Sequence, residues 1–310
     1  MFPAPSRRDF LQVMLGGAAI ASLPQRASAQ PHRAPLAVTQ LSDNLRLISG
    51  AGGNVLLVTG PDGVVLVNGG LQERSAELLK MVAEQSGGQR VVTLFNTDWH
   101  PEHTGSNEAL GKGGTQIIAH ENTKQYLASD RFVDWQKRTY KAKPAPALPT
   151  KTFYTKDTMT LGGERIEYGH LGQAHTDGDV YVFFPGANVL VAGDVLSVGT
   201  YPIADYTTGG WLGGMVTATK TLVDLSNADT RVVPGIGPVQ ARADLQAQHD
   251  MLSTLRDRLG KMMRQGMSAD DMRAAGATKE FDEKWGSPNL FLSTTYRGMW
   301  LHVRELGGVV

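Results

Sequence analysis

The sequence of 310 residues contains no cysteine. Disulfide bonds, cysteine zinc sites, iron–sulfur clusters and cysteine nucleophiles are therefore excluded. Its 30 basic residues balance its 30 acidic residues, so the chain has no formal net charge at pH 7 and no overall field that would attract nucleic acid. We therefore expect no nucleic-acid partner. Since 41% of the residues are hydrophobic, the chain can bury a substantial core.

The apolar stretch near the N-terminus, Val13–Leu23, is too short to cross a membrane. It has 11 residues, whereas a membrane-spanning helix needs about 20. The pair Arg7-Arg8 precedes it and the small residues Ala27-Ser28-Ala29 follow it, which is the pattern of a cleaved signal peptide of the twin-arginine type. We interpret residues 1–29 as this signal. It predicts a bacterial protein, periplasmic or secreted, that meets the twin-arginine export machinery transiently and has no stable membrane anchor.

The remaining chain alternates between predicted strands and helices. Residues 30–40 are predicted to form a linker, and residues 41–310 a single domain with C-terminal helices. Hydrophobic periodicity predicts helices at Ser75–Gln85, Trp211–Leu225, Gln240–Arg264 and Asn289–Leu306. Short runs rich in β-branched residues between glycine and proline turns predict strands at 45–49, 54–59, 63–67, 90–95, 115–119, 158–161, 164–168, 179–184, 188–191 and 231–233.

Two segments without a clear periodic pattern could adjoin a site. Residues 129–150 are basic and aromatic, then proline-rich, and predict either an insertion over the site or a plain surface loop. The aromatic residues Tyr201, Tyr206 and Trp211 could line a pocket for an apolar substrate or could serve only in packing.

Residues that can bind metals cluster directly after the predicted strand 90–95. Asp98, His100, Glu102 and His103 lie within six residues of one another. Imidazole and carboxylate groups are the standard protein ligands of zinc, iron and manganese. This density of donors in one turn favours a metal site over a structural role. Trp99 lies between the donors, and we expect it to be buried and to support the neighbouring ligands by packing.

Two later segments add candidate ligands. His175 lies in Ala174-His175-Thr176 after the predicted strand 164–168, and Asp194 follows the predicted strand 188–191. Taken in order, these motifs and the loop 234–238 resemble the metallo-β-lactamase superfamily over roughly residues 40–240. The resemblance implies an α/β fold: a four-layer αβ/βα sandwich of two mixed β-sheets flanked by helices, with a metal centre at one edge. Asn68 and His170 are weaker candidates for residues that support the ligands.

The sequence departs from the superfamily pattern at three positions. Asp98 stands where the first motif histidine is expected, Glu102 replaces an aspartate, and Ile236 replaces the histidine of the final loop. Isoleucine cannot coordinate a metal. The flanking residues Gly235 and Gly237 keep the character of the loop.

The resemblance therefore implies two unequal metal sites. The first would use Asp98, His100 and His175, with Asp194 alongside. The second would use Glu102, His103 and Asp194, without its imidazole. We expect one firmly bound divalent ion and a second that is weak or absent. Zinc is the expected ion, and the added carboxylates make manganese or iron the alternatives.

The function that this site implies is metal-dependent hydrolysis of a lactam, lactone or other ester-type small molecule. Glu102 and Asp194 would act as catalytic residues that orient water or handle its proton. Two other functions stay open. One is an oxidative enzyme with a single iron, since relatives with such chemistry also mix histidine and carboxylate ligands. The other is a non-catalytic binding protein with a decayed metal site, which Asp98 and Ile236 favour.

Overall fold

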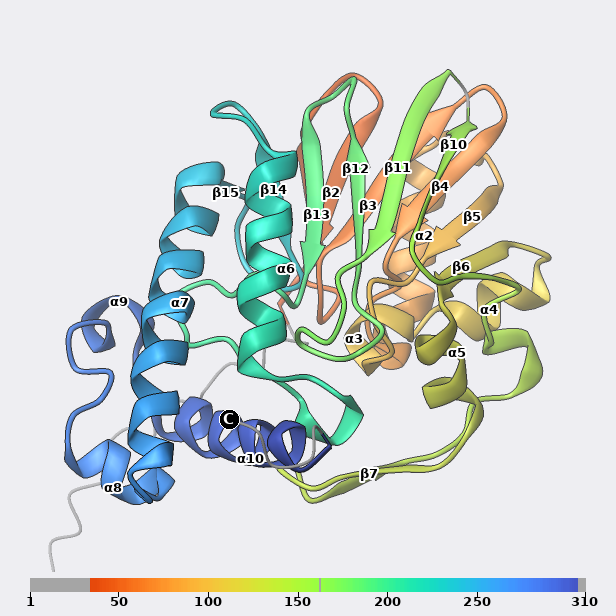
Figure 1. The fold of residues 1–310 in the computed structure, drawn as a ribbon. Coiled ribbons are helices and arrows are strands. Elements are labelled where there is room, and N and C mark those ends of the chain that lie inside the picture. The colour runs from red at the N-terminus through yellow and green to blue at the C-terminus, as the bar shows by residue number, and fades with distance from the viewer. Residues whose placement is uncertain (1–33, 162, 306–310) are drawn as a thin grey trace, which may run out of the picture. The chain divides into compact units, whose positions relative to one another are not determined.

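Two mixed β-sheets pack face to face in the computed structural model, which describes residues 34–161 and 163–305 (Figure 1). The first sheet has the strand order β1-β2-β3-β4-β5-β6-β9. Strands β1 to β4 pair antiparallel, whereas β4, β5, β6 and β9 pair parallel. Its strands are β1 Ala37–Gln40, β2 Leu45–Ser49, β3 Val55–Gly60, β4 Gly63–Val67, β5 Val91–Phe95, β6 Gln116–His120 and β9 Lys151–Phe153.

The second sheet has the strand order β10-β11-β12-β13-β14-β15. Its pairs are antiparallel except for β13 and β14, which are parallel. Its strands are β10 Lys156–Leu161, β11 Glu164–His170, β12 Val180–Phe184, β13 Val189–Gly193, β14 Arg231–Pro234 and β15 Gln240–Ala241. Strands β4 and β13 are buried along their whole length, as expected for strands covered on both faces.

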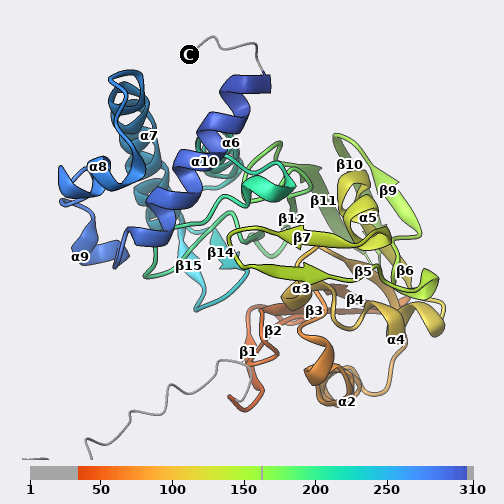
Figure 2. The same cartoon turned by 90° about the horizontal axis from the view of Figure 1, so that it is seen from below.

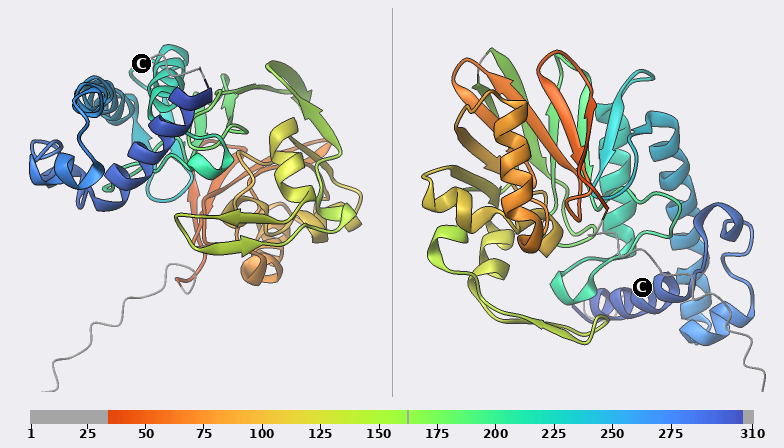
Figure 3. Two further views of the ribbon diagram at one scale, coloured as in Figure 1. Left: turned by 60° about the horizontal axis from the view of Figure 1, so that its bottom comes forward. Right: turned by 180° about the vertical axis from the view of Figure 1, so that it is seen from behind.

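Three hydrophobic cores hold the layers together. The core between the sheets includes Phe95 from the first sheet and Tyr168 from the second, with ring centroids 4.9 Å apart. A second core packs α2 (Ser75–Gln85) against the outer face of the first sheet (Figure 3). A third packs α6 (Leu212–Leu225) and α7 (Arg242–Arg264) beside the second sheet. The predicted αβ/βα sandwich is therefore confirmed.

The other helices are short, apart from the last. They are α3 Pro101–Thr104, α4 Asn107–Lys112, α5 Glu121–Ala128, α8 Ala269–Ala274, α9 Asp282–Trp285 and α10 Asn289–Glu305. The four long helices predicted from the sequence are present as α2, α6, α7 and α10, with ends that differ by at most two residues. The predicted end of the last one, Leu306, lies outside the described residues.

The predicted linker is partly wrong. Ala37–Gln40 form the edge strand β1, which pairs with β2. This strand is mostly exposed, so it carries no buried alternation that a sequence pattern could reveal. The predicted signal peptide, residues 1–29, lies outside the described residues, and so do residues 30–33.

The segment 129–150 contains a β-hairpin that the sequence did not predict. Its strands are β7 (Arg131–Val133) and β8 (Arg138–Tyr140). Seen from below, the hairpin extends from α5 across the edge of the sheets toward α10 (Figure 2). Between residues 34 and 305, with residue 162 left aside, no helix is long and apolar enough to cross a membrane.

Candidate metal centre

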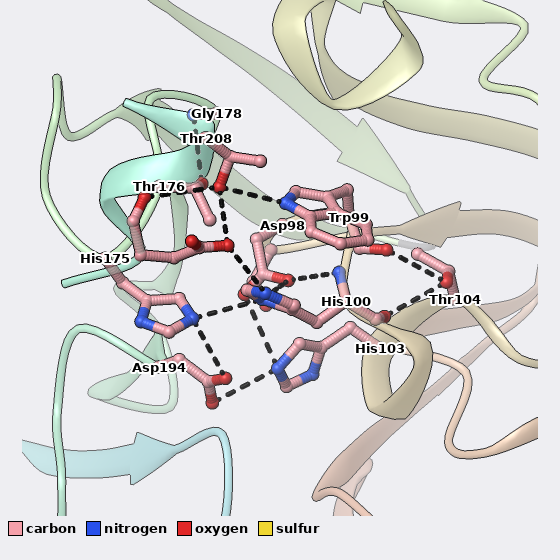
Figure 4. Close-up of polar contacts among 12 residues, drawn as sticks. Asp98, Trp99, His100, His103, Thr104, His175, Thr176, Gly178, Asp194 and Thr208 are labelled. Atoms are coloured by element: carbon pink, nitrogen blue, oxygen red, sulfur yellow. Dashed lines mark hydrogen bonds and ion pairs between the residues drawn. The ribbon is translucent and has the colours of Figure 1, made fainter. Parts of the chain in front are cut away.

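The candidate ligands come from loops that leave the strands at one edge of the two sheets (Figure 1). Asp98 and His100 follow β5, His175 lies between β11 and β12, and Asp194 follows β13. His100 is also the residue that precedes α3, which begins with Pro101. Side chains from three distant segments thus converge in the folded protein (Figure 4).

A first group of donors consists of Asp98, His100, His175 and Asp194. One ligand atom from each lies within 4.8 Å of every other. His100 Nδ1 and His175 Nε2 are 3.1 Å apart, and His175 Nε2 lies 3.5 Å from Asp194 Oδ2. The first three side chains are almost completely buried. The structure therefore brings together the four residues predicted for the first metal site.

A second group consists of Glu102, His103 and Asp194, again with ligand atoms within 4.8 Å. His103 Nε2 lies 3.1 Å from Asp194 Oδ1, so Asp194 faces both groups. The loop after β14 leaves room for this carboxylate because it has glycine at position 235. A Cβ atom on Gly235 would lie 1.8 Å from Asp194 Oδ1.

The charges of the cluster shift the pKa values of its members. Burial opposes ionisation of Asp98, but His103 and a hydrogen bond with His100 hold its pKa well below the usual range. Burial also opposes ionisation of Asp194, but the interaction with His103 outweighs this effect and lowers the pKa of Asp194. Burial would lower the pKa of His103, but Asp98 and Asp194 raise it to about 10. The buried site thus favours anionic carboxylates that need a cationic partner.

Several buried polar atoms of the cluster have no hydrogen-bond partner among the described residues. They include Asp98 Oδ2 and His103 Nε2, which lie 3.5 Å apart and face the centre of the cluster. His103 Nε2 approaches Asp194 Oδ1 at 3.1 Å, close enough for an ion pair but without the geometry of a hydrogen bond. Buried polar atoms are normally satisfied, and unsatisfied ones are costly. A divalent cation would satisfy these atoms, and the mixture of imidazole and carboxylate suits zinc, manganese or iron. The residues present therefore fit a metal ion.

Outer contacts orient the two imidazoles of the first group. His175 Nδ1 lies 2.7 Å from the carbonyl oxygen of Ile203, which can only accept a hydrogen bond. Its proton therefore sits on Nδ1 and leaves the Nε2 lone pair free toward the cluster. His100 has the reverse orientation, with Nε2 3.4 Å from Asp205 Oδ2 and Nδ1 toward the cluster.

Asp205 is a supporting residue that the sequence analysis missed. It is completely buried and accepts hydrogen bonds from Thr208 Oγ1 at 2.9 Å and from Trp135 Nε1 at 2.9 Å. Burial would raise its pKa, but contact with His100 lowers it to about 2. Trp135 lies at the tip of the β7–β8 hairpin, so the carboxylate joins the hairpin to a candidate ligand. Sequence patterns carry no signal for this contact, because Asp205 lies in an irregular loop.

The hairpin tip is also tied to α10. Asp134 accepts a hydrogen bond from Tyr206 Oη at 2.6 Å and pairs with Arg297 of α10. Of the two readings of the segment 129–150, the structure thus favours the insertion over the site, because Trp135 and Gln136 line the cleft.

The cleft above the donors has a volume of about 330 Å³. Tyr201 lines it, whereas Tyr206 and Trp211 line a separate cavity.

Trp99 is buried as expected, with its ring 4.4 Å from the His100 ring. Asn68 Oδ1 accepts hydrogen bonds from Thr97 N and Oγ1, which supports the loop after β5. His170 instead stacks on His120, away from both donor groups.

We expect the protein stripped of metal by a chelator to lose stability as the pH rises above about 5. The lowered pKa values of Asp98 and Asp194 stabilise the fold above the ordinary aspartate value of 3.8, and this contribution is lost in acid. The raised pKa of His103 stabilises the fold fully below 6.5, and this contribution is lost as the pH rises through about 10. Burial raises the pKa of Asp179 from 3.8 to about 7, so its protonated form stabilises the fold in acid and this contribution is lost as the pH rises through about 7.

Thermal unfolding of the chelated protein from about pH 5 to about pH 9 tests this expectation. The Tm should fall across the range, and a rising Tm would contradict the assignment of charges. A zinc-loaded sample is the control. Because metal ligation requires neutral imidazoles, its Tm should hold or rise with pH.

Replacing Asp205 by asparagine should weaken metal binding. The amide keeps the shape of the side chain but removes the charge that faces His100 Nε2. Loss of such an outer partner costs about 10- to 100-fold in metal affinity or activity. Titration with zinc against a competing chelator measures the change. Asp134→Asn, on the hairpin but away from His100, is the matched control, and equal affinities for both variants would show that Asp205 does not orient the ligand.

Comparison with known proteins identifies the family to which this sequence is similar. The sequence profile described as the metallo-beta-lactamase superfamily matches residues 49–239, more than half of the chain. The metallo-beta-lactamase IND-1 of Chryseobacterium indologenes is 25% identical over 140 residues, which cover 45% of this chain and 53% of that protein. The match thus spans about half the length of this curated relative.

Solved structures share the architecture. A metallo-beta-lactamase from Pontibacter korlensis superimposes with a TM-score of 0.58 at 23% identity, covering 71% of this chain and 99% of that one. A double mutant of the sec-alkyl sulfatase PisA1 superimposes with a TM-score of 0.68 at 17% identity, covering 88% of this chain and 51% of that one. At such identities the superpositions establish the fold alone. The profile match over residues 49–239 shows that the chain belongs to the metallo-beta-lactamase superfamily.

Proposed function

We propose that this protein is an exported, metal-dependent hydrolase that acts on a lactam, lactone or other ester-type small molecule. The observation that carries the proposal is the convergence of two donor groups, sharing Asp194, at a cleft open to a substrate. Membership of the superfamily supports the assignment of reaction class. The substrate must be argued from the site itself, because one fold serves many reactions.

The residues have distinct tasks in this proposal. Asp98, His100 and His175 hold the ion, with Asp194 beside them. A divalent ion held there would act as a Lewis acid and would lower the pKa of water from about 15.7 to near 7. Glu102 lines the cleft and is only partly buried, so its carboxylate can orient the attacking water and accept its proton.

We propose one tightly bound ion, with zinc as the expected metal and manganese or iron as alternatives. The first group offers two imidazoles and two carboxylates, which suffices for a catalytic site with three protein ligands and an open position. The second group has a single imidazole, that of His103. Ile236, on the loop where the superfamily pattern has a histidine, adds no donor.

An oxidative enzyme with a single iron is the second candidate. The carboxylates Asp98 and Asp194 beside His100 and His175 favour it, since mixed ligands of this kind suit non-haem iron. Iron-dependent oxygen uptake with no ester hydrolysis would establish it in place of the hydrolase. Absence of any turnover from a protein that binds metal tightly would instead favour a binding function.

His175→Ala should abolish most metal content and activity. The substitution removes a ligand from the first group, so the loss should exceed the roughly 10- to 100-fold typical of an outer partner. Elemental analysis and hydrolysis of p-nitrophenyl butanoate are the readouts. His249→Ala is the matched control, since His249 lies on α7 outside both donor groups. A His175→Ala protein with full metal content and full rate would remove the basis of the proposal.

Ile236→His should raise the metal content from about one ion per chain toward about two, because the second group then gains a nitrogen ligand. Metal per chain after dialysis at matched supply measures the change. Ile236→Leu, which keeps an apolar side chain, should stay near one. Two firmly bound ions in the native protein would contradict the single-ion proposal, as would an unchanged count in the histidine variant.

The Arg7-Arg8 pair supports export by the twin-arginine route. The double substitution Arg7→Lys, Arg8→Lys should leave the precursor in the cytoplasm, whereas Arg26→Lys, near the predicted cleavage site, should not. Cell fractionation followed by immunoblotting distinguishes the two. Normal periplasmic delivery of the double variant would show that the route is another one.

A further inference from the structure

Ile236 lies between two cavities. It is a large apolar side chain that is 51% exposed, on the loop between β14 and β15. On one side it lines the cleft above the donor groups. On the other it lines a groove of about 580 Å³, bounded by β1, β2, the loop after β2 and residues 237–239. The cleft and the groove therefore share this side chain as a common wall.

Asn54 holds Ile236 in this position. Its side-chain amide donates to the carbonyl oxygens of Pro234 at 2.9 Å and Gly237 at 2.8 Å, on either side of Ile236. Its backbone N–H donates to Gly235 O at 2.7 Å. Asn54 is 4% exposed, so these three bonds are sheltered from water. The exposed isoleucine is thus presented by a fixed loop.

The groove offers an apolar chain a suitable surface. Leu47, Pro238 and Val239 line it together with the glycines at positions 50, 52 and 53. None of the described residues that line it is charged. In the cleft, the charged or ionisable lining side chains are those of the candidate ligands and Tyr201, and the described lining contains neither lysine nor arginine.

From this arrangement we infer that the substrate is a neutral ester or lactone with a long apolar acyl chain, which runs from the metal centre across Ile236 into the groove. The inference rests on the proposed hydrolase function. In the reaction, the oxygen of water bonds to the acyl carbon as the acyl C–O bond breaks. One proton of the water passes to the departing alkoxide, so that an ester gives a carboxylic acid and an alcohol, and a lactone gives a single hydroxy acid.

The lack of cationic side chains disfavours substrates with a fixed negative charge near the reacting bond. A carboxylate or sulfate in the cleft would meet Asp194 and Glu102 without a lysine or arginine to offset their charge, and one divalent ion does not neutralise the three carboxylates of the cluster. Apolar contact, in contrast, gains about 0.8 kcal/mol for each buried methylene, which corresponds to a factor of up to about four.

The test is a series of p-nitrophenyl esters with butanoyl, hexanoyl and octanoyl chains, assayed on the zinc-loaded protein. We expect kcat/KM to rise by about two- to fourfold for each methylene. Octyl sulfate, which has the same chain length but an anionic group, should react at least about 100-fold more slowly than the octanoyl ester. A flat chain-length profile, or a preference for the sulfate, would overturn the inference.

A bulky residue in the groove provides the structural control. Thr39 is exposed on the edge strand β1 and lines the groove, whereas its neighbour Gln40 is exposed but does not line it. Thr39→Trp should lower kcat/KM for the octanoyl ester by at least about tenfold and leave the butanoyl ester within about twofold. Gln40→Trp should change neither. Equal effects of Thr39→Trp on both esters would show that the chain does not enter the groove.

Binding of uncleaved amides separates this inference from the proposed reaction. Octanamide should bind more tightly than butanamide in calorimetry, and Thr39→Trp should weaken only the octanamide. If that pattern holds while no ester is hydrolysed, the groove assignment stands and the hydrolase proposal fails. If esters are hydrolysed but the two amides bind alike, the hydrolase stands and the groove assignment fails.

Discussion

The burial of carboxylates beside imidazoles at the sheet edge is the constraint on which the site depends. Asp98 is 1% exposed and His103 is fully buried, so each needs a partner of opposite charge or a metal ion. The loops after β5 and β13 bring these partners together, and the sandwich fixes where the loops begin. The depressed pKa of Asp98 and the raised pKa of His103 are two consequences of the same proximity.

Local sequence patterns predicted much of the fold. Strands such as β4 and β5 are short runs rich in β-branched residues, and α7 has a clear apolar stripe, so these patterns identify them. Strand β1 was not predicted because it is an exposed edge strand that forms through backbone pairing with β2. The β7–β8 hairpin was not predicted either, because its strands have three residues each and are too short to show an alternation of polar and apolar residues.

The cluster of donors after β5 could be predicted from residue type and spacing, and the resemblance to the superfamily implied its division into two groups. Both groups found in the structure, including the sharing of Asp194, match those that the resemblance implied. Asp205 could not be predicted in this way. Its importance comes from three-dimensional contact with His100 and Trp135, which join segments far apart in the chain. The same holds for Asn54, whose hydrogen bonds set the position of Ile236.

The central claim is that Asp98, His100, His175 and Asp194 bind one divalent ion. Anomalous diffraction from crystals grown with zinc, recorded on both sides of the zinc absorption edge, tests it most directly. The account predicts one strong peak at the centre of these four side chains, with ligand atoms at about 2.0–2.2 Å. No peak there, or the strongest peak at the Glu102–His103 side of the cluster, would contradict it.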